Sequence, residues 1–396
     1  MAAVATERRV IAIVTAIQFV NILDFMMVMP LGPDFARGLG IDPAHLGLVA
    51  GAYTVAGCLS GLIGALVLDR FERRSALMVC LAGLGLGTIA ASFAVDLGTL
   101  VLARVIAGLF GGPSTALALS VIADKIPEER RGRALGIVMG GFAIAAVVGV
   151  PAGLELARLG GWRLPFLVVG GAIIGIALVV RLALPSGRRQ GGGSMARLVF
   201  LRRPNTALAL AAVGCANMQA FLVLPATTAY LQFNLDFPRE DMGLLYMIGG
   251  ALSLVGMRVT GRMVDRFGTA PINGAATLLL SLLMFGAFVL VPPPLPLLVL
   301  FPLFMLAMSA RNVGTQTLMS RVPSPTERAG FMSLSTAVQH LAASAGAGIS
   351  SLLLTSDAAG RLTGMASLAG LAIFFAALVP MLQLAIERRM GRGIAR

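Results

Sequence analysis

Twelve long apolar segments alternate with short polar ones along the chain. An α-helix needs about 20 apolar residues to cross the hydrocarbon core of a bilayer, and each segment reaches that length between its turn and charge signals. The segments cover residues 10–31, 45–68, 76–94, 98–123, 134–157, 164–184, 206–230, 242–264, 272–291, 296–319, 329–354 and 364–386. The pattern therefore predicts an all-α membrane protein with twelve transmembrane helices.

The longest polar interruption separates the sixth predicted helix from the seventh. It reads Pro-Ser-Gly-Arg-Arg-Gln-Gly-Gly-Gly-Ser over residues 185–194, a composition typical of a flexible linker. We expect an N-terminal bundle of six helices over residues 1–184, a basic cytoplasmic linker over 185–205, and a C-terminal bundle of six helices over 206–396.

A short motif occurs once in each half, after the second and the eighth predicted helix. Its two aspartates, at positions 69 and 265, are 196 residues apart, and Pro127 and Pro323 keep the same offset. The residues of the motif, with the arginines that follow its first copy, are Asp69, Arg70, Arg73, Arg74, Gly261, Asp265, Arg266 and Gly268. The repeated offset indicates that the two halves arose by duplication.

The composition and the distribution of charge add a location and an orientation. Hydrophobic residues make up 57% of the chain, charged residues only 12%, and the mean hydropathy is +0.89, which is typical of a membrane protein. The net charge of +13 is spread over short loops rather than gathered in one patch, so we expect no nucleic-acid partner. Of the 31 basic residues, 23 lie on one side of the predicted membrane and five on the other. Because basic loops stay in the cytoplasm, we expect both termini on that side of the inner membrane.

The sequence offers little chemistry for an enzyme. His45 and His340 are its only histidines and lie in different halves, no Cys/His/Asp cluster has the spacing of metal ligands, and no Gly-rich loop with a lysine is available for ATP. We therefore expect a transporter that needs no metal or cofactor and is driven by an ion gradient. A membrane sensor that transports nothing stays open as an alternative.

The loop motif and two helix motifs resemble those of the major facilitator superfamily, and the resemblance covers essentially the whole chain. Leu102-Ala-Arg104-Val-Ile-Ala-Gly108 is similar to the arginine motif of that family's fourth helix. Gly149, Pro151 and Gly153 resemble the fifth-helix motif of its proton-coupled drug and arabinose efflux members. The resemblance implies two six-helix bundles, transport by alternating access and a monomeric protein.

The chain departs from the family pattern at three positions. In the first loop copy, Ala65 and Glu72 stand where glycines are expected, so the second copy is the cleaner one. In the fifth helix, Val150 separates a glycine and a proline that drug antiporters usually place side by side. These departures concern the branch of the family rather than the family itself.

The loop motif also has a physical interpretation of its own. Asp69 and Asp265 each lie at the end of a helix, where the helix dipole disfavours a carboxylate. Each therefore needs a partner, either the neighbouring arginines or the N-terminus of a helix in the other half. Such contacts would hold the cytoplasmic side closed, so we interpret the motif as a gate. The alternative is a motif that only turns the loop and sets the orientation.

Asp24 is the leading candidate for proton coupling, because ionisable groups inside a bilayer are costly and are functional by default. It shares a helix face with Asn21, and burial disfavours the charged form of a carboxyl group, which brings proton exchange towards physiological pH. Arg104 lies too deep in its helix to reach water easily and needs a carboxylate or carbonyl partner. A structural Asp24–Arg104 pair is the alternative, and the two interpretations are compatible.

Glu155 and His340 are weaker candidates for proton coupling. Glu155 lies near the outer end of the fifth predicted helix, where Arg158 offers a plain salt bridge one turn on, and we favour that structural interpretation. His340 lies on the polar face of the eleventh helix, where it would be either a second proton site or a neutral hydrogen-bonding group.

Polar and aromatic stripes on several helices predict a mainly apolar substrate cavity, whereas the sixth and ninth helices carry no comparable stripe. The residues expected to line the cavity are Asn21, Phe25, Met27, Asn217, Phe221, Thr228, Arg311, Asn312, Thr336 and Gln339. Methionine and phenylalanine suit variable hydrophobic ligands, because the thioether repacks easily. Arg311 would face an anionic substrate or take part in a structural pair.

These features together predict a proton-coupled antiporter that exports amphipathic or hydrophobic small molecules, with Asp24 as the leading coupling residue. The alternative is a transporter or facilitator of a sugar-like or nucleoside-like metabolite without proton antiport, in which Asp24 would bind the ligand. Coupling to sodium in place of protons stays open as an alternative, although a lone carboxylate supplies few of the oxygen ligands that a cation site needs.

Overall fold

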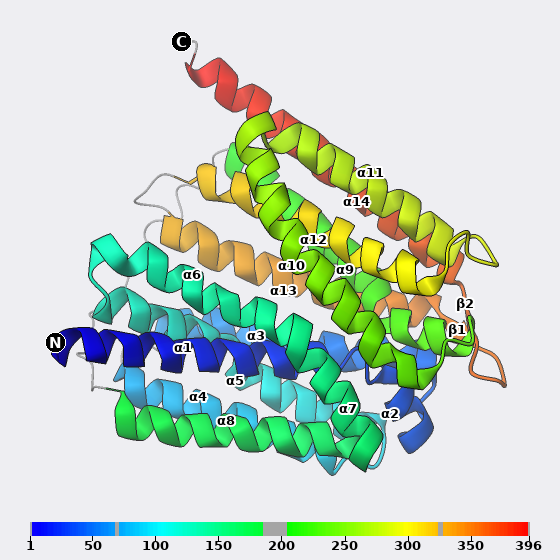
Figure 1. Ribbon diagram of the computed structural model, residues 1–396, viewed down its shortest axis with the longest axis horizontal. Coiled ribbons are helices and arrows are strands. Elements are labelled where there is room, and N and C mark those ends of the chain that lie inside the picture. The colour runs from blue at the N-terminus through cyan, green and yellow to red at the C-terminus, as the bar shows by residue number, and fades with distance from the viewer. Residues whose placement is uncertain (1, 68–70, 185–203, 324–327, 395–396) are drawn as a thin grey trace. The chain divides into compact units, whose positions relative to one another are not determined.

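The computed structural model describes residues 2–67, 71–184, 204–323 and 328–394, and most of them are helical (Figure 1). The chain divides into two compact units. Unit 1 comprises Met1–Ile41 and Leu48–Gly193, and unit 2 comprises Asp42–Gly47 and Ser194–Arg396. Of the linker predicted over 185–205, residues 185–203 lie outside the described part of the chain.

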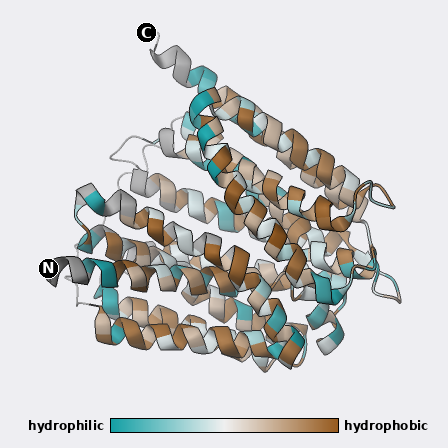
Figure 2. Ribbon diagram, viewed as in Figure 1, coloured by the Kyte–Doolittle hydropathy of each residue, from teal (hydrophilic) through white to brown (hydrophobic). Residues whose placement is uncertain are grey.

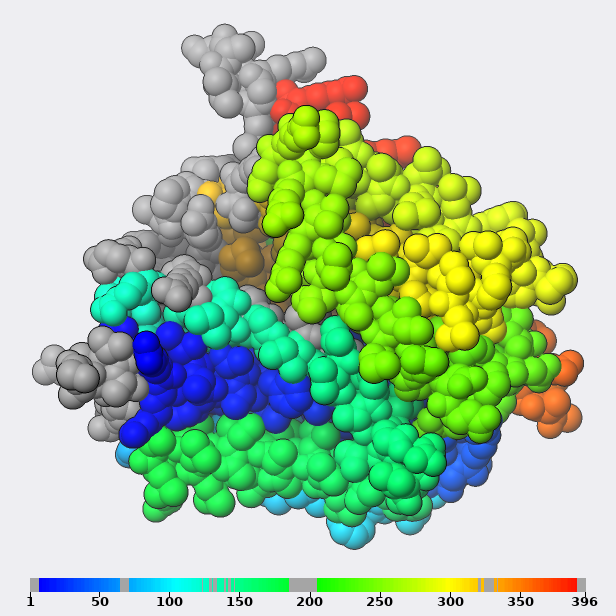
Figure 3. Space-filling model, viewed as in Figure 1, coloured from blue at the N-terminus to red at the C-terminus, as the bar shows by residue number. Residues whose placement is uncertain are grey.

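Unit 1 is a bundle of long helices. Its elements are α1 (Ala2–Met27), α2 (Gly32–Leu39), α3 (Leu46–Val67, of which the first two residues group with unit 2), α4 (Arg73–Ser92), α5 (Leu97–Lys125), α6 (Glu128–Ile144), the π-helical turn η3 (Ala145–Gly149), α7 (Val150–Gly160) and α8 (Arg163–Ala183). Helix α4 packs along α5 and α8, and α1 packs along α5, α6 and α8. On the face of the unit shown in Figure 3, α1 lies between α6 and α8.

Unit 2 is also a bundle of long helices packed along one another. Its elements are η1 (Pro43–His45), α9 (Pro204–Phe233), η5 (Arg239–Asp241), α10 (Met242–Phe267), α11 (Thr269–Phe288), α12 (Leu297–Arg321), α13 (Arg328–Leu353), β1 (Thr355–Ser356), β2 (Leu362–Thr363) and α14 (Met365–Ile394). Helix α9 packs along α13 and α14, α10 along α12, and α11 along α12 and α14.

A small hairpin precedes the last helix. It is the one strand element within the described residues, and the sequence analysis did not predict it. Strands β1 and β2 pair antiparallel, with Thr355 opposite Thr363. The side chain of Asn234, which follows α9, donates to the carbonyl of Leu362 and accepts from its backbone N–H, both at 2.8 Å. Two-residue strands leave no hydropathy pattern of their own, so periodicity could not predict them.

Ten helices in the described part of the chain are long and apolar enough to cross a membrane. Hydrophobic residues run along their length, while hydrophilic residues gather towards helix ends and loops (Figure 2). The other two predicted spans, 134–157 and 329–354, coincide with α6–η3–α7 and with α13. The first is interrupted by η3, and the second carries the polar side chains Thr336, Gln339 and His340, so the total of twelve stays a prediction.

Apolar side chains lie on both the inner and the outer face of these helices. On α4, Leu77, Leu81 and Leu84 are fully buried inside unit 1, whereas Val79 and Leu86 are each more than half exposed. Such exposure along a whole helix would be unfavourable in water and is expected in contact with lipid.

The interruption between α6 and α7 has a local cause. Pro151 has no backbone N–H and cannot donate to the preceding turn, so the regular hydrogen-bond ladder cannot continue unchanged. The chain widens into the π turn η3, where the N–H of Val150 donates to the carbonyl of Ala145. Such π turns occur frequently at functional sites.

Glycines let α3 and α5 approach each other closely. A Cβ added at Gly108 would lie 2.3 Å from the carbonyl oxygen of Tyr53, and one added at Gly112 would lie 2.6 Å from that of Gly57. Two small residues four positions apart are a common device for close helix packing in membranes. This approach brings Tyr53 beside Arg104, one turn before Gly108 on α5.

Helix α5 begins with a capping box. The backbone N–H and the hydroxyl of Thr99 both donate to the carboxylate of Asp96, at 2.7 and 2.9 Å. These hydrogen bonds stabilise the charged carboxylate and hold the pKa of Asp96 below its usual range. The cap defines the start of the helix that carries Arg104.

Candidate functional site

Asp24 and Arg104 form a buried ion pair inside unit 1. Arg104 Nη1 lies 2.9 Å from Asp24 Oδ1, and Arg104 Nη2 lies 3.1 Å from Asp24 Oδ2, so the guanidinium engages both carboxylate oxygens. The side chains are 0% and 1% exposed. The pair joins α1 to α5 across 80 residues of sequence. Two-point contacts of this kind are the strongest that a carboxylate makes with a side chain.

Two further residues complete the surroundings of the pair. The hydroxyl of Thr88 on α4 donates to Asp24 Oδ1 at 2.8 Å, and the guanidinium carbon of Arg104 lies 4.6 Å from the centre of the Tyr53 ring. Asp24 thus accepts from a cation and from a neutral hydroxyl, while Arg104 faces both a carboxylate and an aromatic ring. The sequence analysis did not identify Thr88 or Tyr53, because one threonine or tyrosine in an apolar helix is no signal by itself.

The polar face of α1 continues away from Asp24. Asn21 donates to the hydroxyls of Ser114 and Thr115 on α5, at 2.8 and 3.2 Å. The amide oxygens of Asn21 and Gln18 are buried and accept no hydrogen bond. Positions 18, 21 and 24 are three residues apart and lie on one face of the helix. The amide oxygens of Gln18 and Asn21, which have no donor, therefore lie on the same face of α1 as Asp24.

The fifth-helix motif lies directly against this part of α1. A Cβ added at Gly149 would lie 2.9 Å from Leu23 Cδ1, and one added at Gly153 would lie 3.7 Å from Met27 Cβ. The π turn caused by Pro151 therefore packs next to the turn of α1 that carries Asp24. The motif and the ion pair belong to one region of unit 1.

Of the other residues predicted around Asp24, two are neighbours on its own helix and one lies apart. Phe25 is half-buried, with its ring centre 5.5 Å from that of Tyr53, and Met27 is fully buried. Glu155 is exposed and pairs with Arg158 on the next turn, with Arg158 Nε 2.8 Å from Glu155 Oε2. This pairing raises the pKa of Arg158, and it is the plain salt bridge that we favoured for Glu155.

Unit 2 contains a different buried cation. Arg311 on α12 is 2% exposed and donates to two neutral acceptors on α9, Gln219 Oε1 at 2.6 Å and the carbonyl of Ala216 at 3.1 Å. Its Nε atom is buried without an acceptor. Gln219 is itself oriented by a contact from its amide nitrogen to Met284 Sδ at 3.3 Å.

A second buried polar cluster lies one turn further along α12. Asn273 on α11 donates to Thr315 and to Gln383 on α14, Gln383 donates to Thr315 at 3.1 Å, and Thr315 donates to the carbonyl of Arg311 at 3.0 Å. Thr269, Asn273 and Thr277 form a buried polar stripe on α11. Our expectation that the ninth helix has no such stripe is wrong: Asn273 and Thr277 lie one turn apart within the predicted span 272–291, and Thr269 lies one turn before Asn273.

The remaining cavity residues predicted in the C-terminal half take varied positions within unit 2. Thr228 is buried and forms a hydrogen bond with Tyr246 at 2.9 Å, and Phe221 is also buried. Asn217 is half-buried, and its amide nitrogen donates to the carbonyl of Val213. Asn312 and Thr336 are exposed, and Gln339 and His340 are half-buried. Helical spacing thus identified polar faces but did not decide which members are buried.

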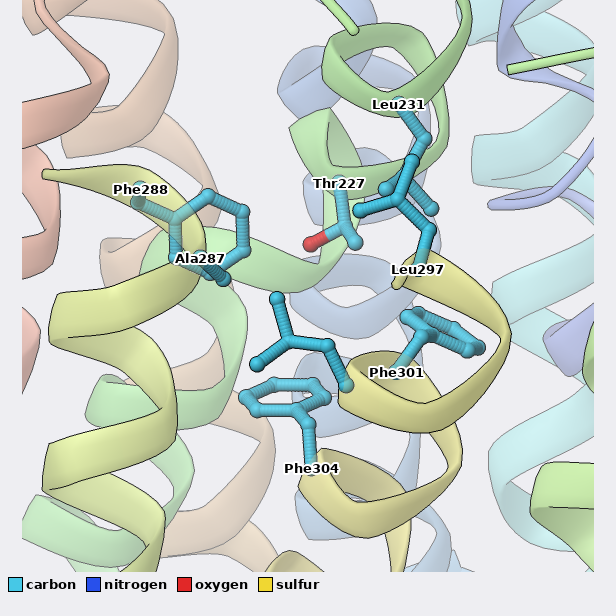
Figure 4. Close-up of a pocket in the computed structure, with 8 residues that line it drawn as sticks. Thr227, Leu231, Ala287, Phe288, Leu297, Phe301 and Phe304 are labelled. Atoms are coloured by element: carbon cyan, nitrogen blue, oxygen red, sulfur yellow. The ribbon is translucent and has the colours of Figure 1, made fainter. Parts of the chain in front are cut away.

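A small apolar pocket lies between α9, α11 and α12 (Figure 4). Thr227, Leu231, Ala287, Phe288, Leu297, Leu300, Phe301 and Phe304 line it. The hydroxyl of Thr227 donates to the carbonyl of Val223 on its own helix, so the pocket offers shape and hydrophobic surface rather than hydrogen bonds.

The gate residues are described only in part. Asp69 and Arg70 lie outside the described residues. Arg73 Nε lies 3.0 Å from Asp124 on α5, and Arg74 Nε lies 3.6 Å from Glu72. Asp124 was not identified from the sequence, although an acidic residue in the last turn of a helix beside Lys125 was a usable signal.

The second copy of the motif ends α10. Asp265 and Arg266 are exposed in its last turn, Gly261 is half-buried, and Gly268 closes the helix at φ +88°, a conformation that favours glycine. The glycine at this position is therefore required by the turn itself. The gate role of both copies stays a prediction.

No group of three or more His, Cys, Asp or Glu side chains that could hold a metal ion occurs among the residues that the structure describes. The ionisable chemistry of the buried regions consists mainly of the Asp24–Arg104 pair and Arg311.

Comparison with known proteins identifies the family. The sequence profile of the Major Facilitator Superfamily matches residues 14–347, which is most of the chain. The chain belongs to the major facilitator superfamily. This membership confirms the resemblance found in the sequence, and it makes the protein a multi-pass membrane transporter rather than an enzyme.

Curated relatives of this major facilitator protein include two bacterial transport or resistance proteins. A chloramphenicol resistance protein of Streptomyces lividans is 31% identical over 271 residues, which cover 64% of this chain and 66% of that protein. The inner membrane transport protein YdhP of Escherichia coli K12 is 28% identical over 263 residues, with 65% of this chain and 66% of that protein covered. The matches thus span just under two thirds of each relative.

Solved structures support the same major facilitator fold. A bacterial homologue of the human lysosomal transporter Spinster superposes with a TM-score of 0.75 in its inward-facing, occupied form and 0.72 in its inward-facing, unoccupied form. The sequence identities are 18% and 17%, and each match covers 96% of this chain and at least 94% of the other. At this identity the similarity concerns the fold alone.

Proposed function

We propose that this major facilitator protein is a proton-coupled antiporter that exports amphipathic or hydrophobic small molecules. The buried Asp24–Arg104 pair carries the proposal. Inside the membrane, the Asp24 carboxyl group is either charged and paired with the fixed cation Arg104, or neutral with a bound proton. Changing between these two states links proton binding to a change in side-chain contacts. No cofactor is needed, because the proton gradient supplies the energy.

Protonation of Asp24 changes what holds α1 and α5 together. The charged carboxylate accepts from both Nη atoms of Arg104 and from Thr88. A protonated carboxyl group loses its charge and becomes a donor at one oxygen, so the two-point contact with Arg104 is weakened. Because an unpaired charge is unfavourable inside the membrane, proton binding favours another packing of this region.

The surroundings and the relatives support an amphipathic or hydrophobic cargo. Phe25 and Met27 flank Asp24 on α1, and such side chains adapt to ligands of different shape. A relative named for chloramphenicol resistance favours movement of an amphipathic compound out of the cell. The excess of basic residues on one side favours an inner-membrane protein with both termini in the cytoplasm, and the resemblance favours a monomer.

Reconstitution tests this function. The protein is placed in liposomes with a trapped pH-sensitive dye, a proton gradient is imposed, and chloramphenicol, a lipophilic cation and a sugar are added in turn. We expect chloramphenicol or the lipophilic cation to trigger a proton flux with the wild-type protein and not with Asp24→Asn. Asp236→Asn is the matched control, because Asp236 is exposed at φ +50°, where asparagine is well accommodated.

Two results would contradict the proposal. One is movement of the compound without proton flux in both wild type and Asp24→Asn, which would indicate a facilitator. The other is an Asp24→Asn protein that keeps full proton flux. Because Asp24→Asn leaves Arg104 without a carboxylate, the double variant Asp24→Asn/Arg104→Gln is measured beside it, and size-exclusion profiles establish that each variant is folded.

A further inference from the structure

The guanidinium of Arg311 is a positive charge that has no carboxylate partner among the residues that the structure describes. Its described contacts are the side-chain oxygen of Gln219 and the carbonyl of Ala216, both neutral, and its Nε has no acceptor. A guanidinium has five N–H donors, so these two contacts leave most of its donor capacity for another group. An arginine side chain stays protonated in proteins, so this charge is not removed by loss of a proton.

The sequence of unit 2 supplies no counterion within the membrane. The acidic residues after position 194 are Asp236, Glu240, Asp241, Asp265, Glu327, Asp357 and Glu387, and all lie at or beyond the ends of the predicted spans. None forms an ion pair with Arg311 in the described part of the chain. Retaining an uncompensated charge at such a depth is unfavourable, and charges kept there generally serve a function.

The internal duplication makes the contrast sharper. The offset of 196 residues aligns Arg311 with Thr115 and Asn217 with Asn21. In unit 1, Asn21 and Thr115 are joined by a hydrogen bond. Unit 1 therefore has a neutral hydroxyl where unit 2 has a cation, and the cation of unit 1, Arg104, has its own aspartate. Packing of the duplicated helices by itself does not require an arginine at position 311.

We propose that Arg311 binds an anionic group, a carboxylate, of an organic ligand. The carboxylate would accept from Nε and from an Nη atom and would supply the charge that unit 2 lacks. Gln219 Oε1 lies 2.6 Å from Nη1 and holds the guanidinium in position. The proposal rests on the transport function proposed above and adds amphipathic carboxylates to its cargo.

Binding to the purified full-length protein in detergent tests this assignment without a proton gradient. The probes are sodium benzoate and benzyl alcohol, which share a ring and differ in the charged group, with gluconate as the buffer anion. We expect benzoate to bind at least tenfold more weakly to Arg311→Gln than to wild type. Benzyl alcohol should bind equally weakly to both. Arg258→Gln is the matched control, because Arg258 lies within an apolar span but is exposed, and it should leave benzoate binding unchanged.

Three results would overturn the assignment: benzoate affinity that is the same in wild type and Arg311→Gln, an equal loss in Arg258→Gln, or chloride that competes with benzoate at equal concentration. The last would indicate an inorganic anion site. Because no gradient is present, loss of proton antiport leaves these measurements unaffected, so the two proposals fail separately.

A second variant keeps the test valid if Arg311→Gln does not fold. Gln219→Leu removes the acceptor of Nη1, so the charge of Arg311 is compensated by fewer protein groups and favours an added anion more strongly. We expect benzoate to bind at least threefold more tightly to Gln219→Leu than to wild type. A purely structural arginine predicts lower stability of this variant with no gain in benzoate affinity, and that result would refute the proposal.

Discussion

At the scale of single residues, the Asp24 carboxylate depends on the donors around it. Thr88 is fully buried and supplies a neutral donor at 2.8 Å. Thr88→Val keeps the shape of the side chain and removes the hydroxyl, so we expect a loss of about 0.5–1.5 kcal/mol in the free energy of unfolding. Denaturation of the purified protein in detergent measures it. Thr88→Ser retains the donor and should recover most of the loss, and equal stability of Thr88→Val and wild type would show that the hydrogen bond contributes nothing.

Asp96 allows a prediction of pH dependence outside the membrane. Its pKa is lowered by the hydrogen bonds from Thr99, so its charge stabilises the folded state above the unfolded pKa of about 4, and this contribution is lost as the pH falls through the lower, folded value. Asp96→Asn keeps an amide cap without the charge. Wild type should have the higher midpoint of thermal unfolding at pH 7, with the difference shrinking below about pH 4. A difference that does not change with pH would exclude this role of the charge.

Sequence reasoning at this scale found the charged residues and missed their neutral partners. A lone Asp24 or Arg104 in an apolar helix is conspicuous because burying a charge is costly. Thr88 and Tyr53 resemble any threonine or tyrosine in a helix, and only the packing of α3 and α4 against α1 and α5 brings them to the pair. Asp124, the partner of Arg73, is charged and was also missed, although its place in the last turn of α5 was a usable signal.

At the scale of the elements, close contact between α3 and α5 positions Tyr53 beside Arg104. Gly108→Ala would place a methyl group 2.3 Å from the carbonyl oxygen of Tyr53, so the helices must move apart. We expect a loss of about 1–3 kcal/mol in the free energy of unfolding. The control is Gly140→Ala on α6, where an added Cβ meets no atom within 4 Å. Similar stability of the two variants in the same denaturation assay would contradict this account of the contact.

The apolar pattern predicted where the helices lie, because a helix that faces lipid must be apolar over its whole crossing. The predicted span 76–94 corresponds to α4 and 272–291 to α11, with differences of a few residues at the ends. The pattern did not predict that span 134–157 divides at η3. That break follows from how Pro151 alters the hydrogen bonds of its own helix, which hydropathy does not record.

At the scale of the whole molecule, the distribution of basic residues predicts the orientation. With 23 basic residues on one side and five on the other, both termini should lie in the cytoplasm. A fluorescent protein fused after Arg396 should fluoresce, and alkaline phosphatase fused there should be inactive. Phosphatase fused after Gly160, in a loop predicted outside, should be active. An active phosphatase at the C-terminus would reverse the assignment.

The sequence by itself determined that this is a helical, multi-pass membrane protein of the major facilitator superfamily, and it predicts a duplication, because hydropathy, repeated motifs and loop charge are properties of local segments. Only the tertiary structure decided which buried groups meet. It pairs Asp24 with Arg104 and Thr88, it brings Tyr53 beside Arg104, and it surrounds Arg311 with neutral acceptors. Whether a buried charge is neutralised depends on contacts between helices far apart in the chain, and those contacts follow from packing rather than from the composition of any one helix.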